Sequence, residues 1–406
     1  MKYTFKDICT KIGSGATPTG GKEAYKGGDY ALVRSQNVLD YTFTTSGLAY
    51  INETQAKKLD GVKVEVGDVL LNITGDSVAR ACIIPDEILP ARVNQHVAII
   101  RANNQYALNE YLLYFLQYNK QYLLSISQGG GTRNAITKKM IEDIEIDLPS
   151  IEDQTAIVNI INSISKKIEI NQQINDKLEQ QAKTLYKSWF VDFEPFKDGN
   201  FVESEIGDIP AGWSIVKFGD ITEIAKKTIN PQKFPDSTFY HYSLPACDNG
   251  LIPEIQAGKD IMSNKIILQN NITLFSKLNP RIKRIWFTCE VLPNSICSTE
   301  FIPFRAKDDN ESSYIFSIVN SDAFYATVMG CVNGATGSHQ RFHAEDTEDF
   351  LCPYNKDAVN EFSKLIEPIL SQMHDLRHEN VMLASTRDTL LPRLMSGELK
   401  INEIDC

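Results

Sequence analysis

Two stretches of this chain repeat one heptad pattern, and that repeat constrains the fold more than any other feature. Residues 157–189 and 362–394 align at a shift of 205, with seam residues spaced alternately four and three apart. The first seam is Ile157, Ile161, Ile164, Ile168, Asn171, Asn175, Leu178, Ala182, Leu185 and Trp189, and the second is Phe362, Ile366, Ile369, Met373, Leu376, Asn380, Leu383, Arg387, Leu390 and Leu394. A 3.5-residue period kept this long predicts two helices that pair as a coiled coil.

Asparagines interrupt the apolar seam and predict its register. Asn175 and Asn380 occupy equivalent positions of the repeat, and a buried Asn fixes register at a cost in stability. If the helices pair antiparallel about a pseudo-twofold axis near residue 173, Asn171 faces Asn380. The alternative is two ordinary amphipathic helices on separate cores, although such helices seldom keep a strict 3.5-residue period. Pro368 is the weakest point, because proline inside a helix costs about 3 kcal/mol and the distal helix could start after it.

The segments before the two helices also correspond. YTFKDICTKI resembles WSIVKFGDITEI, GDVLLNITGDSVAR matches NNITLFSKLNPRIKR at a shift of 203, and GGGTRNAI resembles GATGSHQRF. ALVRSQNVL, VKVEVGDVLLNIT, ARACII and HVAIIRA read as strands, and residues 107–123 read as a helix with a counterpart in SYIFSIVNSDAFYATVM. We therefore expect an α+β protein: two globular domains separated by a long antiparallel two-helix coiled coil, in a pseudo-twofold internal repeat.

No motif in the chain predicts catalysis. GSGATPTGGKE has two glycines at the spacing of a phosphate-binding loop, but Gly21 stands where that motif requires Lys, so we expect a flexible loop. The [DN]PP[FY] motif of amino-methyltransferases, GxSxG and HExxH are absent. A nuclease motif can be assembled only from Pro235-Asp236 and Glu398-Leu399-Lys400, which lie about 160 residues apart.

Metal binding and secretion are not expected either. His339 with His343, and His374 with His378, are four residues apart, but two histidines without a nearby Cys or spaced carboxylate make a weak site. The eight cysteines contain no CxxC pair, which predicts reduced thiols in a cytoplasmic protein. No apolar run reaches the roughly 18 residues of a membrane helix, and the N-terminus lacks the apolar stretch of a signal peptide.

Polar loop residues recur at matching places in both halves. Arg, Asn and Gln can each make two hydrogen bonds to a base edge, and glycine lets a loop approach a groove closely. In the first half these candidates for DNA contact are Arg34, Gln36, Asn37, Arg80, Asn94, Gln95, His96, Thr132, Arg133 and Asn134. In the second half they are Arg281, Lys283, Arg284, Ser338, His339, Gln340 and Arg341. For any single residue a structural role in a polar loop is the simpler explanation, and their repetition favours DNA binding.

Charge and helix length shape this hypothesis. The net charge is −11 and no segment is strongly basic, so the basic residues must gather on one face or a partner must supply positive charge. A helix of about 35 residues is about 50 Å long, and a turn of DNA is about 34–36 Å. Two domains on such a rod would read a two-part, asymmetric site.

Several runs resemble the specificity subunits of Type I restriction-modification systems. LYKSWFVDFEPFKDGNFVESEIGDIPAGW is similar to their central region, LLPRLMSGELK to their distal tail, and LVRSQNV, GDVLLNITG, RVNQHVAIIR and LPSIEDQTAI to their first-half motifs. The resemblance implies a non-catalytic subunit with target recognition domains at residues 1–150 and 196–352, each reading half of a bipartite DNA sequence. Residues 151–195 would be the central helix, and 353–406 the distal helix and tail, which together act as spacer and docking surface.

The resemblance also implies partners. Two modification subunits would bind S-adenosylmethionine and methylate adenine in double-stranded DNA, and restriction subunits using ATP and Mg would join them, while this chain binds no cofactor. Exposed apolar residues of the first helix would then be available to the partner: Ile160, Ile174, Tyr186, Phe190 and Phe193. The residues expected to dock it are Tyr186, Trp189, Phe190 and Phe193. The alternative is that the aromatic residues pack on the second globular domain.

The second half departs from the family pattern, and one alternative function stays open. The second half lacks the LVRSQN and NQH strings of the first, and its glycine loop is longer than GGGTRN, so its contact residues are assigned less directly. The alternative function is a stand-alone regulator with two DNA-binding domains on a coiled coil, which would bind one site tightly without partners.

Overall fold

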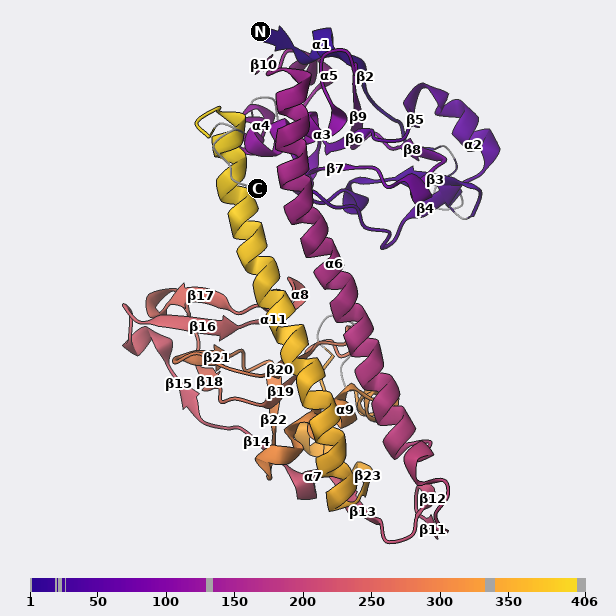
Figure 1. The fold of residues 1–406 in the computed structure, drawn as a ribbon, viewed down its shortest axis with the longest axis vertical. Helices are drawn as coiled ribbons and strands as arrows, with labels where there is room; N and C mark the ends of the chain where they lie inside the picture. The colour runs from indigo at the N-terminus through magenta and orange to yellow at the C-terminus, as the bar shows by residue number, and fades with distance from the viewer. Residues whose placement is uncertain are drawn as a thin grey trace. The chain divides into compact units, whose positions relative to one another are not determined.

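The computed structural model describes residues 2–18, 20, 24–25, 27–128, 134–332 and 340–399 (Figure 1). The chain forms two compact units: unit 1 comprises residues 1–166 and 384–406, and unit 2 comprises residues 167–383. Two 40-residue helices, α6 (Ile151–Phe190) and α11 (Lys356–Met395), each contribute to both units. Across the described ranges, no helix combines the length and apolarity needed to cross a lipid bilayer.

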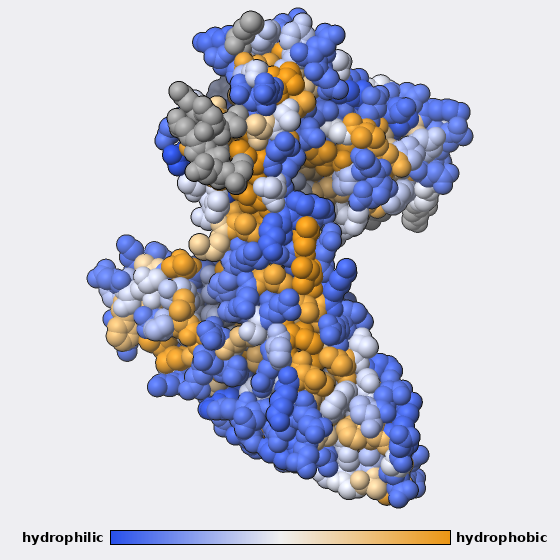
Figure 2. All heavy atoms as spheres, in the orientation of Figure 1, coloured by the Kyte–Doolittle hydropathy of each residue, from blue (hydrophilic) through white to orange (hydrophobic). Residues whose placement is uncertain are grey.

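In each unit α6 and α11 run antiparallel. In unit 1, Ile157 and Ile161 share a core with Leu394, and in unit 2 Tyr186 shares a core with Phe362. Figure 2 shows apolar side chains in a strip along the two helices of unit 2. The first long segment is therefore joined to the second by an apolar seam, as the heptad pattern predicts.

The register of the seam is the one predicted from the asparagines. The Nδ2 of Asn171 donates to Oδ1 of Asn380 at 2.9 Å and to Oε2 of Glu379 at 2.8 Å, and Asn171 is fully buried. The Nδ2 of Asn380 donates in turn to the carbonyl of Ile168 at 3.3 Å. The predicted pairing of Asn171 with Asn380 is confirmed.

The distal helix is continuous through Pro368. Ile366, Ile369 and Leu370 around it are all buried in the core of unit 2. Burial of these apolar neighbours offsets the backbone hydrogen bond that proline cannot donate.

Unit 1 contains, within its described part, two four-stranded sheets and a short β1-β10 pair. The sheet orders are β2-β9-β6-β7, which is antiparallel, and β4-β3-β8-β5, in which β3 and β8 are parallel. The strands are β1 (Lys2–Thr4), β2 (Cys9–Ser14), β3 (Tyr30–Val33), β4 (Ala49–Ile51), β5 (Lys63–Val64), β6 (Val69–Asn72), β7 (Ala81–Ile83), β8 (Ala91–Val93), β9 (Val97–Ala102) and β10 (Glu145–Asp147). The shorter helices are α1 (Phe5–Ile8), α2 (Glu53–Lys58), α3 (Asn109–Tyr118), α4 (Lys120–Ser127) and α5 (Lys138–Glu142).

Two predicted elements of unit 1 are divided in the structure. The run VKVEVGDVLLNIT forms β5 and β6 rather than one strand, because Gly67 turns the chain with φ +79°. The helix predicted at residues 107–123 divides into α3 and α4 at Asn119, whose backbone leaves helical geometry and whose Nδ2 donates to the carbonyl of Phe115 at 2.9 Å.

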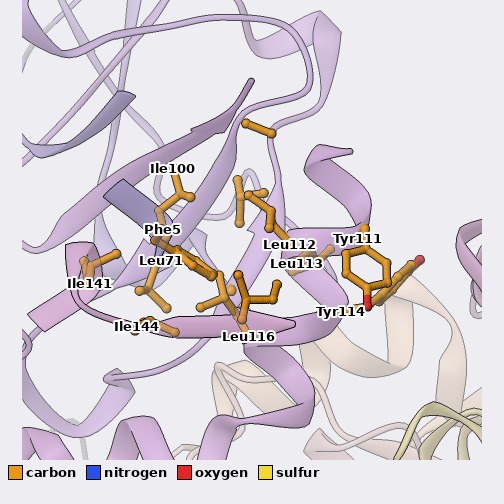
Figure 3. Close-up of a cluster of buried hydrophobic side chains, with 14 of the residues drawn as sticks. Phe5, Leu71, Ile100, Tyr111, Leu112, Leu113, Tyr114, Leu116, Ile141 and Ile144 are labelled. Atoms are coloured by element: carbon orange, nitrogen blue, oxygen red, sulfur yellow. The ribbon is translucent and has the colours of Figure 1, made fainter. Parts of the chain in front are cut away.

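The core of unit 1 forms where α3 packs against the β2-β9-β6-β7 sheet. Phe5 is fully buried among Leu71, Ile100, Leu116 and Ile144 (Figure 3). Alternate residues of β6 and β9 face this cluster, while Leu70 and Ile99 face a second cluster on the other side of the sheet. The sheet is thus buried on both faces, and its strand ends present loops to solvent.

Unit 2 repeats this plan. Its sheet orders are β14-β22-β19-β20 and β15-β18-β21-β16-β17, in which β16 and β21 are parallel, with short β13-β23 and β11-β12 pairs. The strands are β11 (Phe201–Ser204), β12 (Gly207–Pro210), β13 (Ser214–Lys217), β14 (Thr222–Ile224), β15 (Thr228–Ile229), β16 (Thr238–Tyr242), β17 (Glu254–Ala257), β18 (Lys265–Ile267), β19 (Ile272–Ser276), β20 (Ile285–Thr288), β21 (Ser295–Cys297), β22 (Phe301–Ala306) and β23 (Leu351–Tyr354). The helices are α7 (Phe218–Ile221), α8 (Leu244–Asp248), α9 (Ser312–Asn320) and α10 (Asp322–Gly330).

Candidate nucleic-acid interface

Two predicted segments of unit 1 leave the β4-β3-β8-β5 sheet at the same edge. Strands β3 and β8 are parallel with Val33 opposite Val93, so Arg34 and Asn94 follow neighbouring strand ends. The backbone N–H of Asn94 donates to the carbonyl of Val33 at 3.0 Å. Parallel strands thus bring the LVRSQN and VNQH strings together, although 60 residues separate them in the sequence.

Gly15, in the glycine-rich segment, packs against the end of strand β8. Its N–H donates to the carbonyl of Asn94 at 3.1 Å, and a Cβ on it would lie 1.7 Å from the carbonyl oxygen of Val93. Only glycine fits so close an approach. This part of the segment that resembles a phosphate-binding loop therefore supports the strand end.

The turn at residues 34–37 is held by its own side chains. Asn37 is fully buried, and its Nδ2 donates to the carbonyls of Thr44 at 3.0 Å and Ser46 at 3.2 Å. The guanidinium of Arg34 donates to the carbonyl of Gly47. Gln36 is exposed, and its amide also reaches the carbonyl of Gly47 at 3.2 Å.

Asn72, which the sequence reasoning missed, joins this turn to β6. Its Nδ2 donates to the carbonyls of Ser35 at 2.9 Å and Val38 at 3.1 Å, and the residue is fully buried. The available signal was a polar residue ending the apolar run VLLN, since a buried amide must find hydrogen-bond partners.

His96 connects the 94–96 segment to the loop that follows β6. Its Nδ1 lies 2.6 Å from Oγ1 of Thr74 and its Nε2 lies 2.8 Å from Nε2 of Gln95. When the Gln95 amide donates to Nε2, the ring proton sits on Nδ1 and is donated to Thr74. Asn94 is buried and its Oδ1 accepts from the N–H of His96 at 3.0 Å, so both neighbours fix the histidine.

Arg80 lies on the loop between β6 and β7, and Asn134 is hydrogen-bonded to that loop. The N–H of Gly75 donates to the carbonyl of Asn134 at 3.1 Å, and the side chain of Asn134 is exposed. Arg80 is half-buried, and its side chain makes no hydrogen bond or ion pair with the described part of the chain. Thr132 and Arg133 lie outside the described residues. One end of unit 1 thus gathers the 34–37 turn, the 94–96 segment, the 72–80 loop and Asn134.

Unit 2 builds the same hydrogen-bonded frame. Four backbone hydrogen bonds of unit 1 each have a counterpart in unit 2. In unit 1 they are Asn94 N to Val33 O (3.0 Å), Ile73 N to His96 O (3.0 Å), Asn72 N to Arg80 O (2.8 Å) and Gly75 N to Asn134 O (3.1 Å). Their counterparts in unit 2, in the same order, are Ser298 N to Tyr242 O (3.0 Å), Lys277 N to Glu300 O (2.9 Å), Ser276 N to Arg284 O (3.0 Å) and Asn279 N to Gln340 O (2.8 Å). The counterparts of Asn94 and His96 are therefore Ser298 and Glu300. Sequence matching missed them because the backbone pattern recurs without the side chains.

The predicted basic residues of unit 2 have different surroundings. Arg284 makes two hydrogen bonds to Asp248, at 2.6 and 2.8 Å, and only 13% of its side chain is exposed. Lys283 donates to the carbonyl of Asn320 at 2.7 Å, and burial lowers its pKa. Arg341 makes two hydrogen bonds of 3.2 Å to Glu300, with its side chain 42% exposed.

The other predicted residues of this face are only partly defined. Arg281 is exposed, and no described residue forms a hydrogen bond or ion pair with its guanidinium. Gln340 lies beside Asn279 through its backbone, and its Oε1 is buried without a hydrogen-bond partner among the described atoms. Ser338 and His339 lie outside the described residues.

Within the described ranges, no three His, Cys, Asp or Glu side chains are grouped to hold a metal ion. The ring centres of His374 and His378 lie 4.4 Å apart. The pKa of His374 is lowered mainly by burial of its ring and, to a smaller extent, by the charge of His378. Burial also raises the pKa of the Cys82 and Cys297 thiols to about 12, so these cysteines remain protonated and unreactive.

The expected exposure of Tyr186, Phe190 and Phe193 is wrong. They are 6%, 2% and 6% exposed. Tyr186 and Phe190 belong to the core of unit 2, and the ring of Phe193 lies 5.4 Å from that of Trp213, which packs against this core. The ring of Phe190 lies 4.6 Å from that of Tyr314 and 5.0 Å from that of Phe362. The alternative drawn from the sequence, packing on the second globular domain, is confirmed for Phe190.

Each unit has a surface groove beside the last turns of a long helix. In unit 2, Phe190, Val191 and Phe193 line a groove of about 730 Å³ together with Leu351 and Pro353. In unit 1, Leu394 at the equivalent end of α11 and Leu399 beyond it line a groove of about 810 Å³ together with residues 147–149. The two grooves share two corresponding parts of the repeat, the end of a long helix and the short strand β23 in unit 2 or β10 in unit 1.

Comparisons with known proteins agree on one family. Residues 1–180 match the family described as the Type I restriction modification DNA specificity domain. The chain is 30% identical to the Type I restriction enzyme HindI specificity subunit of Haemophilus influenzae, over 91% of this chain and 94% of that protein. It is 25% identical to the MjaIX specificity subunit of Methanocaldococcus jannaschii, over 98% and 93% of the two chains.

A solved structure shares the fold. The S subunit of a Type I restriction-modification system from M. genitalium superimposes with a TM-score of 0.54 at 13% identity, covering 97% of this chain and 95% of that one. With the matches in sequence, this likeness leads to one conclusion: the chain belongs to the family of Type I restriction-modification specificity subunits, the non-catalytic subunits that recognise DNA.

Proposed function

We propose that each half of this chain reads one part of a bipartite, asymmetric DNA site. Residues 1–150 and 196–352 are the two target recognition domains, and the helices within residues 151–195 and 353–406 set the distance between them. The observation that carries the proposal is the frame of backbone hydrogen bonds built twice in the chain, each time surrounded by loops with Arg, Asn or Gln. Two copies of one frame with different side chains suit two different half-sites.

Within each half, the proposed contacts divide by their surroundings. Gln36, Arg80 and Arg281 are exposed or half-exposed and suit contact with bases or phosphates. Asn37 and Asn94 are buried and bonded, and they support the loops from which neighbours reach DNA. Thr132, Arg133, Ser338 and His339 remain candidates outside the described ranges.

The partners we propose are two adenine methyltransferase subunits that bind S-adenosylmethionine. The presence of one such groove in each unit supports this number, since a repeated surface suits a repeated partner. Around the first groove, Val191 and Ile206 are 53% and 43% exposed, and the buried Phe190 and Phe193 form part of its wall. Restriction subunits using ATP and Mg would join this complex in the cytoplasm.

The test is to co-express the chain with a candidate adenine methyltransferase subunit from its own genome and map methylated adenines across that genome. We expect one bipartite motif, and replacing residues 1–150 by those of a relative should change only one half of it. Replacing residues 196–352 is the matched control and should change only the other half. Sequence-specific, tight binding by the chain alone would favour the stand-alone regulator, and a swap that alters both halves would contradict the division of labour.

A further inference from the structure

The recognition face of unit 2 contains an arginine that is both oriented and exposed. The Nε of Arg341 donates to Oε2 of Glu300, and its Nη2 donates to Oε1, each at 3.2 Å. The arginine side chain is 42% exposed and the glutamate 29%. The carboxylate therefore holds the guanidinium plane while leaving part of it at the surface.

The other cations predicted on this face lack that combination. Arg284 is also held by a carboxylate, that of Asp248, but it is only 13% exposed. Lys283 is anchored on a backbone carbonyl and lies 5.3 Å from the ring centre of Tyr325. Arg281 is exposed, yet no described side chain orients it.

The donors left on Arg341 match one base edge. A guanidinium has five N–H groups, and Glu300 takes one from Nε and one from Nη2. The remaining donors include one on each terminal nitrogen, side by side. That pair fits O6 and N7 of guanine in the major groove.

Unit 1 uses the same position of the frame in a comparable way. Glu300 corresponds to His96, because their backbone carbonyls accept equivalent hydrogen bonds. The carbonyl of Glu300 accepts from the N–H of Lys277, which follows β19, and that of His96 accepts from the N–H of Ile73, which follows β6. The His96 ring is bonded to the amide of Gln95, a predicted contact residue. In both units this position thus orients a neighbouring side chain that can bond to a base.

We propose that Arg341, held by Glu300 as its positioning residue, reads a guanine in the half-site bound by unit 2. This rests on the proposed function, in which unit 2 binds one half of the site. Fixing the guanidinium before binding reduces the conformational entropy lost in the complex.

The test uses the chain purified with its methyltransferase and duplexes carrying the mapped site or each single base change in this half-site. Arg341→Ala should lower affinity for the mapped site by about 5- to 150-fold and abolish discrimination at one G·C pair only. Arg341→Lys, which keeps the charge, should lose the same discrimination because Lys lacks the two-donor fork. Glu300→Gln should relax that position with a smaller loss, and adding it to Arg341→Ala should have little further effect.

The matched control is a second Arg–Glu pair of unit 2. Arg305 lies 3.4 Å from Glu223 and is 35% exposed, but it is on the β14-β22 strands rather than the recognition loops. Arg305→Ala and Glu223→Gln should leave every base preference unchanged. Thermal unfolding of each complex separates altered recognition from altered folding.

The outcomes separate two failures. Equal weakening on all duplexes by Arg341→Ala would assign the residue to phosphate and overturn the guanine reading, as would a specific complex whose half-site lacks guanine. Unchanged discrimination in Arg341→Lys would do the same even if Arg341→Ala failed to fold. A wild-type complex without sequence preference would instead contradict the proposed function itself.

Discussion

At the scale of single residues, the loops proposed to contact DNA are held together by buried side chains that would not themselves touch DNA. Asn72 bonds to two carbonyls of the 34–38 turn, and Asn37 spans that turn from inside. Each is fully buried, so replacing either would leave carbonyls without partners. The exposed side chains nearby can vary more freely, because the loops do not depend on them.

Gly15 offers a sharp test at this scale. Gly15→Ala would place a Cβ 1.7 Å from the carbonyl oxygen of Val93, so the strand edge must shift. We expect the free energy of unfolding to fall by about 1–3 kcal/mol, measured by urea denaturation followed by circular dichroism. Gly13→Ala is the control, because its Cβ would meet only the end of the Lys11 side chain at 3.8 Å. Equal effects of the two changes would show that close approach is not the cause.

Prediction from sequence worked best for the helices and least well for the loops. The heptad seam gave the antiparallel register because helix periodicity is regular enough to extrapolate over many residues, as the Asn171–Asn380 bond shows. The equivalence of Glu300 with His96 could not be found this way, since it lies in backbone bonds that many side chains permit. For Phe190 the sequence left exposure and packing on the second domain as alternatives, because a helix pattern does not reveal which outer face a globular domain will cover.

At the scale of elements, the paired helices contain a polar contact where apolar packing would be stronger. Asn171 and Asn380 bond to each other within the seam, with Glu379 and Lys167 beside them at 3.4 Å from each other. A polar pair of this kind favours one register over its neighbours, which lie a heptad away. The register of the paired helices therefore depends on this side-chain contact as well as on apolar packing.

Breaking and replacing this pair should have opposite effects. Asn171→Leu alone leaves the Asn380 amide facing an apolar group and should lower the free energy of unfolding by about 1–3 kcal/mol. Asn171→Leu with Asn380→Leu removes both polar groups and should restore or exceed the original stability. Asn175→Leu is the control, because its Oδ1 is buried without a partner among the described atoms, and we expect no loss. The free energies of unfolding are measured by urea denaturation. A double variant less stable than Asn171→Leu alone would contradict this account.

At the scale of the whole molecule, the repeat makes each half complementary to a copy of itself. In the pairing observed, Asn171 faces Asn380, and residue 380 corresponds by the shift of 205 to residue 175. A chain ending after residue 196 would therefore pair with a second copy so that Asn171 of one faces Asn175 of the other. In the same pairing, Trp189 of one copy would take the place of Leu394 near Ile157 of the other.

We expect residues 1–196 to form a homodimer, measured by light scattering at micromolar concentration. In this dimer the α6 helix of the second copy would cover the apolar seam that α11 covers in the full chain. The hydrophobic contribution to helix pairing is therefore preserved. Changing Ile157 and Ile161 to Asp should give monomers, whereas changing the exposed Glu169 and Lys177 to Ala should not. A half-chain that stays monomeric would show that the second half contributes contacts that the first cannot reproduce.

The doubled frame described above consists of amides and carbonyls, which every amino acid except proline supplies alike. Mutations at the loop tips can therefore accumulate without disturbing the scaffold beneath them. One domain of such a protein can acquire a new base preference while the other domain keeps the old one. Proteins with different DNA sites can therefore diverge from one ancestral half-gene.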